Sequence, residues 1–457
     1  MTVEPPPVGG FDFDVPILII GAGACGLVAA LSTTEHGGEV LVVEADAVPS
    51  GSTALSAGLI PAAGTKAQAA AGIEDRPALF AEDIQAKAKG ENPPELVQTL
   101  AENAGPAIDW LSDRFKLPFT VVDDFDYPGH SRRRMHGLPT RAGQELIDRL
   151  RSTAEDAGID IICNRRARTL FVEEGVIKGV ALDGPEGVET VGCDALVLAC
   201  NGFGGNAEMV ARHMPDITGA VWFGHSGNQG DAIGWGQALG ARMLHLGAYQ
   251  GHGNVATPHG ILITWAVITE GGIQVNLNGH RFWDESQGYS EAARAVLAEP
   301  DGVAWTIFDS RIAGVARQFQ DFKDAEAAGA IRMAESLADL AAVCDLDPQA
   351  LEATVTGLPQ GGTDAFGRRF EGPPLAPPFA AVRVTGALFH TQGGLEVGPD
   401  ARVQRKEGGT FANLFAAGGA AVGVSGKGDS GYLSGNGLLS AVVLGRIAGR
   451  SAAMLSG

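Results

Sequence analysis

A glycine-rich turn between an apolar strand and a helix near the N-terminus constrains the fold of this chain more than any other feature. Residues 15–20 form a short, apolar run rich in β-branched side chains, which predicts a buried parallel strand. The run GAGACG follows at residues 21–26, and the residues after it predict a helix that continues to about His36. This order of elements predicts a doubly wound α/β fold.

The three glycines have the spacing of a turn that binds the pyrophosphate of a dinucleotide. Gly21 permits the tight turn, Gly23 lets backbone N–H groups approach the phosphates, and Gly26 lets the helix pack closely on the strand. A second predicted strand, residues 39–43, leads to Glu44, which lies 18 residues after Gly26. A carboxylate there accepts hydrogen bonds from both ribose hydroxyls, which favours an unphosphorylated adenosine ribose. The motif by itself does not separate NAD from FAD.

Composition excludes several classes of protein. The chain has 457 residues, enough for two or three domains, and 33 Lys and Arg against 54 Asp and Glu give a net charge of −21. This balance argues against nucleic acid or an anionic membrane as a partner. Five cysteines without a CxxC pair predict reduced thiols in the cytoplasm and no metal site. Residues 15–34 carry no charge, but their spaced glycines favour a strand–turn–helix over a membrane span.

The segment after the acidic strand supplies small side chains and hydroxyls. Residues 50–60, SGSTALSAGLI, suit a backbone that passes close to a flat isoalloxazine ring. With this segment the chain resembles the FAD-dependent fumarate reductase and succinate dehydrogenase flavoprotein superfamily. The sequence GSTALSAG is most similar to the 3-ketosteroid dehydrogenase branch of that superfamily. Some relatives attach FAD to a histidine here, and residues 50–56 contain none. The resemblance therefore implies non-covalent FAD.

Four further motifs follow in the family's order, so the resemblance covers most of the chain. They are DALVLACNGFGGN at 194–206, with Asn201 where glycine is usual, NLNGHRFWDE at 276–285, HTQGG at 390–394, and LFAAGG at 414–419 with the helix after residue 437. The cofactor-binding residues that the motifs and the resemblance imply are Gly21, Gly23, Ala24, Gly26, Glu44, Ser52, Thr53, Ser56, Gly58, Ala167, Ala199, Gly418, Asn436 and Leu438.

The order of predicted elements divides the chain into two domains. Strands at about 15–20, 39–43, 168–172, 176–181 and 194–199, and helices at about 95–115 and 142–157, predict a Rossmann-like FAD-binding domain with a small β meander. Residues 249–389 have a mixed pattern, with a helical run at about 334–357. By resemblance they form an inserted α+β capping domain, and residues 1–248 with 390–457 form the FAD-binding domain.

The resemblance also indicates which residues would meet a substrate. Fumarate reductases use one arginine as proton donor, a second arginine and two histidines for the substrate carboxylates, and an acid and a base as a relay. The motifs of this chain place His252 and His390 at the histidine positions. Tyr289 and Tyr432 stand at the two arginine positions, and the relay positions hold Trp265 and Ile268. A chain with these replacements should protonate a fumarate carbanion poorly.

Tyrosines at both positions are similar to the 3-ketosteroid dehydrogenases, which take a third tyrosine from a Tyr-Pro loop that residues 126–129 resemble. Removing hydrogen from the carbons beside a ketone needs a hydrogen-bond donor on the carbonyl, a base for the α proton and a flavin for the hydride. Tyr432 and the Asn436 backbone N–H are the predicted carbonyl donors. Tyr289 is the predicted base and Tyr127 its hydrogen-bond partner.

Three functions follow from these assignments. The first is an FAD-dependent dehydrogenase that introduces a double bond beside a ketone, in a cyclic ketone or a keto acid similar to an oxocyclohexanecarboxylate. The second is a reductase of an unsaturated carboxylic acid, similar to fumarate or urocanate reductases, and the third is a non-catalytic flavin electron carrier. The tyrosines favour the first, and the two histidines keep the second open. The expected electron partner is a diffusible acceptor or an electron-transfer protein.

Overall fold

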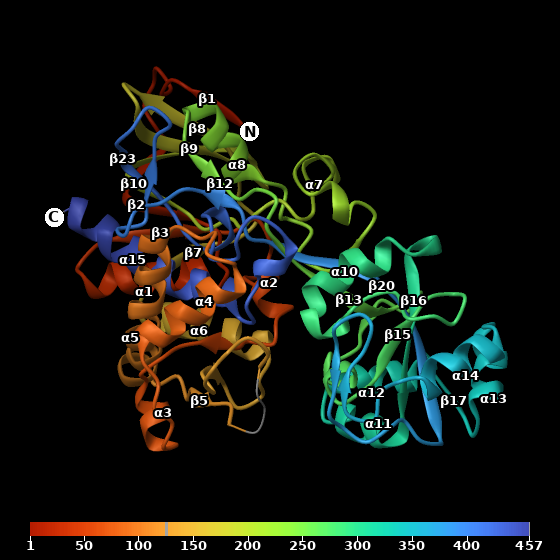
Figure 1. The fold of residues 1–457 in the computed structure, drawn as a ribbon. Helices are drawn as coiled ribbons and strands as arrows, with labels where there is room; N and C mark the ends of the chain where they lie inside the picture. The colour runs from red at the N-terminus through yellow and green to blue at the C-terminus, as the bar shows by residue number, and fades with distance from the viewer. Residues whose placement is uncertain (124–126, 457) are drawn as a thin grey trace. The chain divides into compact units, whose positions relative to one another are not determined.

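The chain folds into two compact units, each with its own sheet. The computed structural model describes residues 1–123 and 127–456 of the 457 in the chain. Unit 1 comprises Met1–Met214, Gly224–Tyr249 and His390–Gly457, and unit 2 comprises Pro215–Phe223 and Gln250–Phe389 (Figure 1). Residues 215–223 belong to unit 2 because strand β11 (Val221–Trp222) pairs with residues 387–388 of strand β20. Unit 2 is thus inserted into the sequence of unit 1.

The sheet of unit 1 joins a parallel layer to an antiparallel meander. Its strands follow the order β1-β8-β9-β10-β2-β3-β7, with β23 paired to β10 and β22 to β23. Strand β10 takes part in both halves, since its first half pairs antiparallel with β9 and its second half parallel with β2 and β23. The bounds are β1 Thr2–Glu4, β2 Phe13–Ile20, β3 Val40–Val43, β7 Asp160–Ile162, β8 Arg166–Glu173, β9 Val176–Gly184, β10 Gly187–Leu198, β22 Arg402–Gln404 and β23 Thr410–Ala416. This sheet confirms the predicted α/β fold with a small meander.

The helices of unit 1 cover this sheet, and in Figure 1 α1, α5 and α6 lie below strands β2 and β3. The larger ones are α1 Ala24–Glu35, α5 Pro94–Phe115, α6 Gly143–Asp156 and α15 Asn436–Ser456. Helices α1 and α15 pack backbone to backbone, because a Cβ at Gly449 would lie 2.0 Å from the Ala29 oxygen. The smaller elements are α2 Gly51–Ala54, α3 Lys66–Ala70, α4 Pro77–Lys87, α7 Ala207–His213, α8 Asp231–Leu239, β4 Ile60–Pro61, β5 Thr120–Val121, β6 Met135–Gly137, β12 Met243–Leu244 and β21 Gly394–Leu395.

Helix α15 is long and apolar enough, by length and composition, to cross a membrane. However, 72% of its apolar window is buried inside the structure. Its side chains Leu439, Val442, Val443 and Leu444 belong to the same core as strands β2 and β10. The helix therefore has the environment of a core helix. The uncharged run at residues 15–34 forms most of β2, the glycine turn and most of α1, as the strand–turn–helix interpretation predicted.

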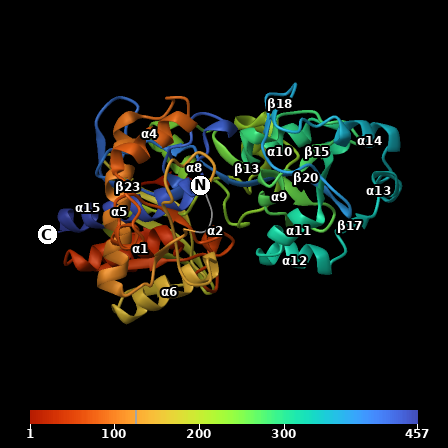
Figure 2. The same cartoon turned by 60° about the horizontal axis from the view of Figure 1, so that its bottom comes forward.

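Unit 2 is built on a seven-stranded sheet that helices cover on both faces (Figure 2). In strand β16 (Val303–Asp309), Ala304 and Phe308 pack with helices α9 to α12, whereas Trp305 and Ile307 pack with α13 and α14. The alternation follows from the two-residue period of a strand. Besides β11 and β16, the sheet contains β13 Tyr249–Ala256, β14 Ile261–Leu262, β15 Ile273–Val275, β17 Ile331–Ala334 and β20 Phe379–Thr391. Strands β18 Gly362–Thr363 and β19 Arg369–Phe370 pair only with each other. The helices are α9 Ala266–Thr269, α10 Tyr289–Leu297, α11 Ser310–Ala316, α12 Gln320–Ala327, α13 Leu337–Cys344 and α14 Pro348–Thr356.

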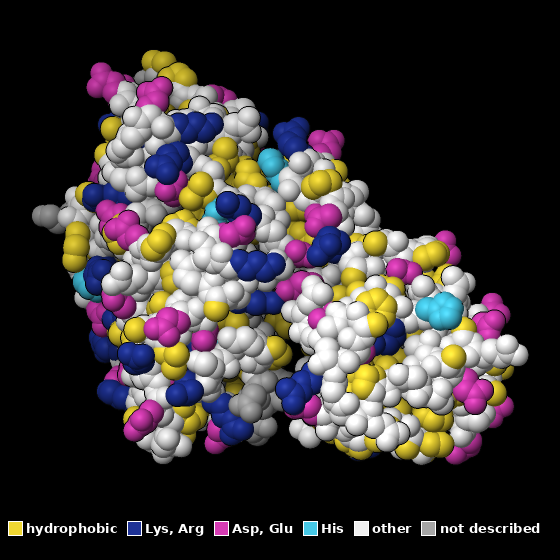
Figure 3. Space-filling view, viewed as in Figure 1, with side chains coloured by type: hydrophobic (Ala, Val, Ile, Leu, Met, Phe, Trp, Pro, Cys, Tyr) yellow, Lys and Arg dark blue, Asp and Glu magenta, His cyan; other side chains and the backbone are white. Residues whose placement is uncertain are grey.

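The expected helical run at 334–357 is two helices rather than one. Helix α13 ends at Cys344, and Asp345 after it has φ +57°, the left-handed conformation that stops a helix. Asp347 then caps α14 by accepting the Gln349 and Ala350 N–H groups. On the face shown in Figure 3, acidic and basic side chains are interspersed.

Candidate functional site

The glycine turn after β2 has the shape of a dinucleotide site. Gly21 has φ +104°, and a Cβ there would lie 2.6 Å from the Ala199 oxygen. A Cβ at Gly26 would lie 1.8 Å from the Gly21 oxygen, so the helix contacts the turn directly. At Gly23, in contrast, the nearest atom to a Cβ is Thr53 Oγ1 at 3.5 Å. The turn is therefore closed by protein at its ends and open at Gly23, where a phosphate would approach.

Glu44 lies beside this turn with capacity to bind a ribose. Its Oε2 accepts the Ala22 N–H at 2.7 Å and its Oε1 accepts the Asp46 N–H at 3.0 Å. Each carboxylate oxygen has a second lone pair, so the group can still accept the two ribose hydroxyls. The Arg165 N–H donates to the Glu44 carbonyl at 2.8 Å, and Ala167 follows two residues later, buried on β8. The residues predicted for the adenosine end therefore lie together.

The predicted hydroxyls of the loop at residues 50–58 have different partners. Thr53 Oγ1 accepts the Ala24 N–H at 3.1 Å and so caps helix α1. Ser56 Oγ donates to the Thr53 carbonyl at 2.7 Å and accepts the Gly58 N–H at 3.1 Å. These residues shape the loop with bonds inside the protein. Ser52 Oγ differs, because it accepts bonds from two side-chain amides, Asn201 Nδ2 at 3.1 Å and Asn228 Nδ2 at 2.8 Å.

The motif at 194–206 brings a second turn to the same place. The Ala199 N–H donates to the Ile20 carbonyl at 2.9 Å, and Asn201, two residues later, has φ +64°. Asparagine tolerates this left-handed conformation, which explains how it replaces a glycine here. A Cβ at Gly419 would lie 2.1 Å from Asn201 Oδ1, and Gly418 has φ +58°. Residue 419 must therefore be glycine for Asn201 to fit, whereas Gly418 is favoured by its own left-handed backbone.

At the start of α15, Asn436 differs from its predicted role. Its backbone N–H donates to the Leu433 carbonyl at 3.1 Å, so this donor is engaged in a turn. Its side-chain Nδ2 donates to the Val424 carbonyl at 3.0 Å and to Ser425 Oγ at 3.2 Å. Its Oδ1 is buried and has no hydrogen-bond partner in the described part of the chain. A buried acceptor of this kind fits an N–H donor of a ligand, and the isoalloxazine of FAD carries one. The residues present therefore fit FAD.

A chain of hydrogen bonds leads from Asn436 to His390. Ser425 Oγ donates to Gln392 Oε1 at 2.7 Å, and Gln392 Nε2 donates to His390 Nδ1 at 2.8 Å. Burial lowers the pKa of His390 to about 4, so the ring is neutral. Nδ1 also lies 3.4 Å from the Thr391 carbonyl oxygen, but the shorter bond from Gln392 assigns Nδ1 as the acceptor and the one hydrogen to Nε2. The ring lies against helix α15, since a Cβ at Gly437 would be 2.9 Å from His390 Nε2. His390 therefore presents an N–H donor.

Tyr432 lies against the same histidine. The two rings pack edge to face, with centroids 5.4 Å apart and an interplanar angle of 74°. Burial strongly raises the pKa of the Tyr432 hydroxyl, and backbone hydrogen bonds from Gly435 and Gly437 offset only part of this. The phenol thus stays protonated. Tyr432 and His390 are two neutral donors on one side of unit 1, with Leu438 in the first turn of the adjacent helix.

The predicted third tyrosine, Tyr127, also belongs to unit 1. It packs on the cluster of Leu59, Val122 and Met135. The turn after it contacts the segment of Tyr432, because a Cβ at Gly129 would lie 2.7 Å from Leu433 Cδ1. Asp126 of this motif lies outside the described residues. The structure therefore brings Tyr127 into unit 1, while its predicted partner Tyr289 belongs to unit 2.

In unit 2, His252 is held by aromatic rings. It stacks between Tyr289, at 5.0 Å and 18°, and Phe389, at 5.4 Å and 23°. Phe389 in turn stacks on Phe223 at 4.9 Å and 13°, and we call Phe223, Phe389, His252 and Tyr289 the aromatic column. His252 Nδ1 accepts the Asn254 N–H at 3.2 Å, and burial lowers its pKa to about 3. This histidine is also neutral, with its hydrogen on Nε2.

Two features fix the position of the column. Strand β13 presses on helix α10, because a Cβ at Gly253 would lie 2.3 Å from the Ala292 carbonyl carbon. The RFxxE motif before α10 is structural, since buried Glu285 accepts Arg281 Nε at 3.0 Å and pairs with Arg368 Nη1 at 3.1 Å. The two relay positions are apolar core, as Trp265 and Ile268 pack with Trp283.

The sequence analysis did not predict several residues important to this geometry, above all Gln392, Ser425 and Phe389. Gln392 could have been predicted, because it lies two residues after His390 on an extended segment, and residues with that spacing share a face. No sequence pattern indicates Ser425, because it contacts Gln392 only after a distant loop has folded. Among the described residues, no three His, Cys, Asp or Glu side chains are grouped as metal ligands would be.

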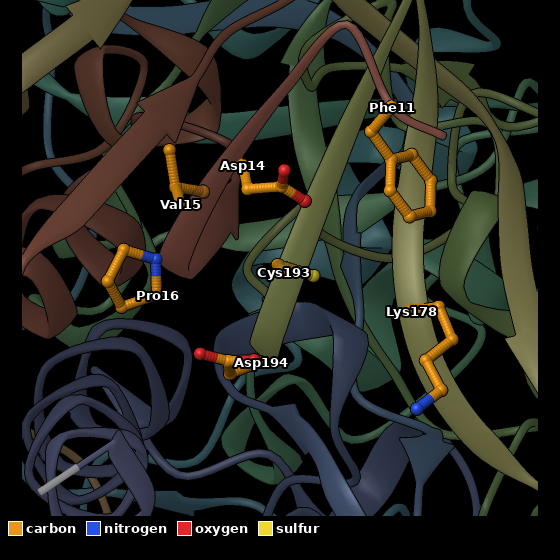
Figure 4. Close-up of a pocket in the computed structure, with 7 residues that line it drawn as sticks. All are labelled: Phe11, Asp14, Val15, Pro16, Lys178, Cys193 and Asp194. Atoms are coloured by element: carbon orange, nitrogen blue, oxygen red, sulfur yellow. The ribbon is translucent and has the colours of Figure 1, made fainter. Parts of the chain in front are cut away.

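One cavity of unit 1 lies apart from these residues (Figure 4). It has a volume of about 360 Å³ and is lined by side chains such as Asp14, Lys178, Cys193 and Asp194. Asp14 is at the start of β2, whereas the glycine turn follows its end. Burial, with the charges of Asp194 and Asp14, raises the pKa of the Cys193 thiol to about 12. The thiol is therefore not a nucleophile, and the cavity carries no catalytic group of this kind.

Comparison with known proteins gives a consistent result. The model of the FAD binding domain family matches residues 16–438. A probable fumarate reductase of Shewanella frigidimarina is 32% identical over 447 residues, which cover 96% of this chain and 74% of that protein. A urocanate reductase of Eggerthella lenta is 26% identical, covering 98% of this chain and 76% of that protein. The solved open conformation of a flavocytochrome c3 fumarate reductase has a TM-score of 0.84 and 30% identity over 98% of this chain and 79% of that one.

These similarities correct the leading expectation from the sequence. Relatives with 30–32% identity over nearly the whole chain are named fumarate reductases. The predicted dehydrogenase that introduces a double bond beside a ketone, with a cyclic ketone or keto acid as substrate, is therefore wrong. The predicted FAD cofactor is confirmed at the level of the family. The alternative of a reductase of an unsaturated carboxylic acid is the better supported one.

Proposed function

The chain belongs to the FAD-binding oxidoreductase family that contains the fumarate reductases, and we propose that it reduces the carbon–carbon double bond of a small unsaturated carboxylic acid. The observation that carries the choice of substrate is the charge state of the predicted substrate residues. His390 and His252 are neutral, Tyr432 is protonated, and Tyr289 stands where the family resemblance expects an arginine.

Neutral donors suit a substrate with one carboxylate rather than two. The Tyr432 O–H and the His390 Nε2–H can donate to the two oxygens of one carboxyl group. A dicarboxylate such as fumarate would bring a second negative charge, and removing that charge from water without a cationic partner costs several kcal/mol. The proposed substrate is therefore a monocarboxylic 2-enoic acid.

The aromatic column favours a flat substituent on that acid. His252 is stacked between Tyr289 and Phe389, and Trp265 packs on its edge at 5.8 Å. Rings of this kind bind aromatic groups by stacking and by edge contacts. A relative is named urocanate reductase, and urocanate is an unsaturated acid that carries an aromatic ring. We therefore assign an arylacrylic acid as the substrate class.

The proposed roles of the residues follow the chemistry of the reduction. The hydride for the double bond would come from bound, reduced FAD. Tyr289 donates the proton of its phenol to the carbon next to the carboxyl group, as a general acid. Tyr432 and His390 donate hydrogen bonds to the carboxyl oxygen on which negative charge grows. The two electrons come from a diffusible reductant or an electron-transfer protein.

We propose further that FAD is bound without a covalent link. The loop at residues 50–56 that follows the acidic strand contains no histidine, cysteine or tyrosine. Precipitation of the yellow protein with acid should release all of the flavin into the supernatant. Flavin that stays in the pellet would contradict this proposal.

The function is tested by anaerobic turnover with reduced methyl viologen as the electron source. The panel is cinnamate, urocanate, acrylate and fumarate, which vary the aromatic group and the number of carboxylates separately. We expect oxidation of the dye with cinnamate or urocanate, and a kcat/KM for fumarate lower by about tenfold or more, the scale of about 1.4 kcal/mol. If fumarate is reduced fastest, the assignment of a monocarboxylate is wrong. If no acid of the panel oxidises the dye, the reductase itself is wrong.

A further inference from the structure

Ser52 has an arrangement of hydrogen bonds that its neighbours in the loop do not share. A serine hydroxyl has one hydrogen to donate and two lone pairs that accept. Ser52 Oγ accepts Asn201 Nδ2 at 3.1 Å and Asn228 Nδ2 at 2.8 Å, so both lone pairs are used. No described residue accepts the Ser52 hydrogen. The Ser52 hydroxyl can therefore still donate one hydrogen bond.

The orientation of the two amides is set by the protein. Asn201 Oδ1 accepts the Gly202 N–H at 2.9 Å, which directs its Nδ2 toward Ser52. Asn228 is 5% exposed, and the Gly205 N–H bond at 2.9 Å to its carbonyl fixes its backbone, so its side chain is packed inside the protein. Asn201 and Asn228 therefore act on Ser52 as fixed donors.

Contacts place this triad on the side of the cofactor site that leads to the predicted substrate residues. Asn201 is followed by Gly202, and a Cβ at Gly202 would lie 1.9 Å from Thr391 Oγ1. Thr391 is the neighbour of His390 in sequence. Glu44, the residue predicted to bind the adenosine ribose of FAD, accepts a hydrogen bond from the Ala22 N–H instead. The part of FAD that passes Ser52 is therefore the part that extends toward the substrate, which is the isoalloxazine ring.

We propose that Asn201 and Asn228 are positioning residues that direct the Ser52 hydroxyl hydrogen to the isoalloxazine of bound FAD. A donor on this ring stabilises the reduced form more than the oxidised form, because reduction increases the electron density on the ring acceptors. The triad thus raises the reduction potential of the flavin. The inference depends on FAD binding and is independent of the substrate.

The experiment compares the midpoint potential of bound FAD in three variants with that of the parent protein. In Ser52→Ala we expect the affinity for reduced FAD to fall about tenfold relative to oxidised FAD, which lowers a two-electron potential by about 30 mV. Asn201→Gly keeps the left-handed backbone and removes one amide, so we expect a shift of the same sign and about half the size. Both are measured by dye-linked reductive titration, with the affinity for oxidised FAD measured separately.

Ser56→Ala is the matched control, because it removes a hydroxyl from the same loop. The Ser56 hydroxyl donates to the Thr53 carbonyl and accepts from Gly58, so its loss loosens the loop without removing a donor to the cofactor. We expect the potential to stay at the value of the parent. Equal shifts in Ser52→Ala and Ser56→Ala would assign the effect to loop packing and overturn the proposal. Equal loss of affinity for oxidised and reduced FAD in Ser52→Ala would also overturn it. If Ser52→Ala does not retain FAD, the potential of Asn201→Gly decides.

Discussion

Each unit buries one of the two predicted substrate histidines in its neutral form, but the two units hold that histidine by different means. In unit 1, His390 accepts a hydrogen bond from Gln392, which in turn is fixed by Ser425 and Asn436. In unit 2, His252 lies between two rings of the aromatic column and makes one bond to a backbone N–H. The hydrogen bonds of unit 1 determine which nitrogen of His390 carries the hydrogen. The stacked rings of unit 2 determine the position of the His252 ring.

This difference indicates what a substitution changes in each unit. A change in the hydrogen-bonded chain alters which nitrogen of His390 carries the hydrogen, and so alters chemistry without much change in shape. A change in the aromatic column alters the surface that surrounds His252, and so alters which substrates fit. The comparison thus predicts that the hydrogen-bonded chain and the Tyr289 hydroxyl affect the rate, and that the rings of the aromatic column affect the choice of substrate.

The largest expected effect is a difference in acid stability between the two units. Burial lowers the pKa values of His130, His136 and His390 in unit 1 to about 4, and that of His252 in unit 2 to about 3. Below the unfolded value of about 6.5 the unfolded chain binds more protons, so each histidine lowers the free energy of unfolding by about 1.4 kcal/mol per pH unit down to its folded pKa.

Unit 1 contains three of these histidines and should lose stability faster as the pH falls from 6.5 toward 4. Hydrogen–deuterium exchange with mass spectrometry, corrected for the intrinsic effect of pH, reports each unit separately. We expect protection to fall first in peptides of unit 1. Earlier loss of protection in unit 2 would show that groups other than the buried histidines control acid unfolding.

The second effect concerns proton transfer in unit 2. In Tyr289→Phe the ring stays in the aromatic column and the hydroxyl is lost. We expect kcat for reduction of an arylacrylic acid to fall by about 10²-fold or more, the usual scale for the loss of a general acid. Binding of FAD and its reduction by dithionite should not change. A variant with the kcat of the parent would show that the proton comes from another group.

A third effect tests the hydrogen-bonded chain of unit 1. Gln392→Leu removes the donor to His390 Nδ1, and we expect kcat/KM to fall by about tenfold, the scale of one lost hydrogen bond to a reacting group. Gln392→Glu places an acceptor there instead, which draws the hydrogen to Nδ1 and raises the pKa of His390. Only the protonated ring then keeps the Nε2–H donor, so the activity of this variant should fall as the pH rises through the raised pKa, whereas the neutral ring of the parent keeps that donor. Identical profiles in the two variants would contradict the assigned tautomer.

The sequence predicted features that depend on neighbouring residues and missed those that depend on distant ones. The glycine turn was predictable because Gly21, Gly23 and Gly26 act within one strand–turn–helix. The chain from His390 to Asn436 was not, because Gln392, Ser425 and Asn436 come from separate segments that meet only in the folded unit. The aromatic column likewise combines residues 223, 252, 289 and 389.

The direction of the reaction was also beyond the sequence, for a chemical reason. A tyrosine that removes a proton in one direction donates it in the other, because both directions share one transition state. The roles that we assign to Tyr289 and Tyr432 are therefore compatible with either direction of electron flow. Relatives named as reductases support the reducing direction that we propose.

The smallest expected effect tests the aromatic column as a determinant of substrate choice. Phe389→Leu removes the ring that stacks on His252 at 5.4 Å. Aromatic pairs contribute about 0.5–1.5 kcal/mol, so we expect KM for cinnamate to rise by about twofold to tenfold while KM for acrylate, which has no ring, stays the same. Phe223→Leu is the matched control. Both variants lose the stacking of Phe223 on Phe389, but only Phe389→Leu also loses the ring that stacks on His252. Phe223→Leu should therefore change KM for cinnamate less. Equal changes for cinnamate and acrylate, or a larger change in Phe223→Leu, would show that the column supports the fold of unit 2 and does not select the substrate.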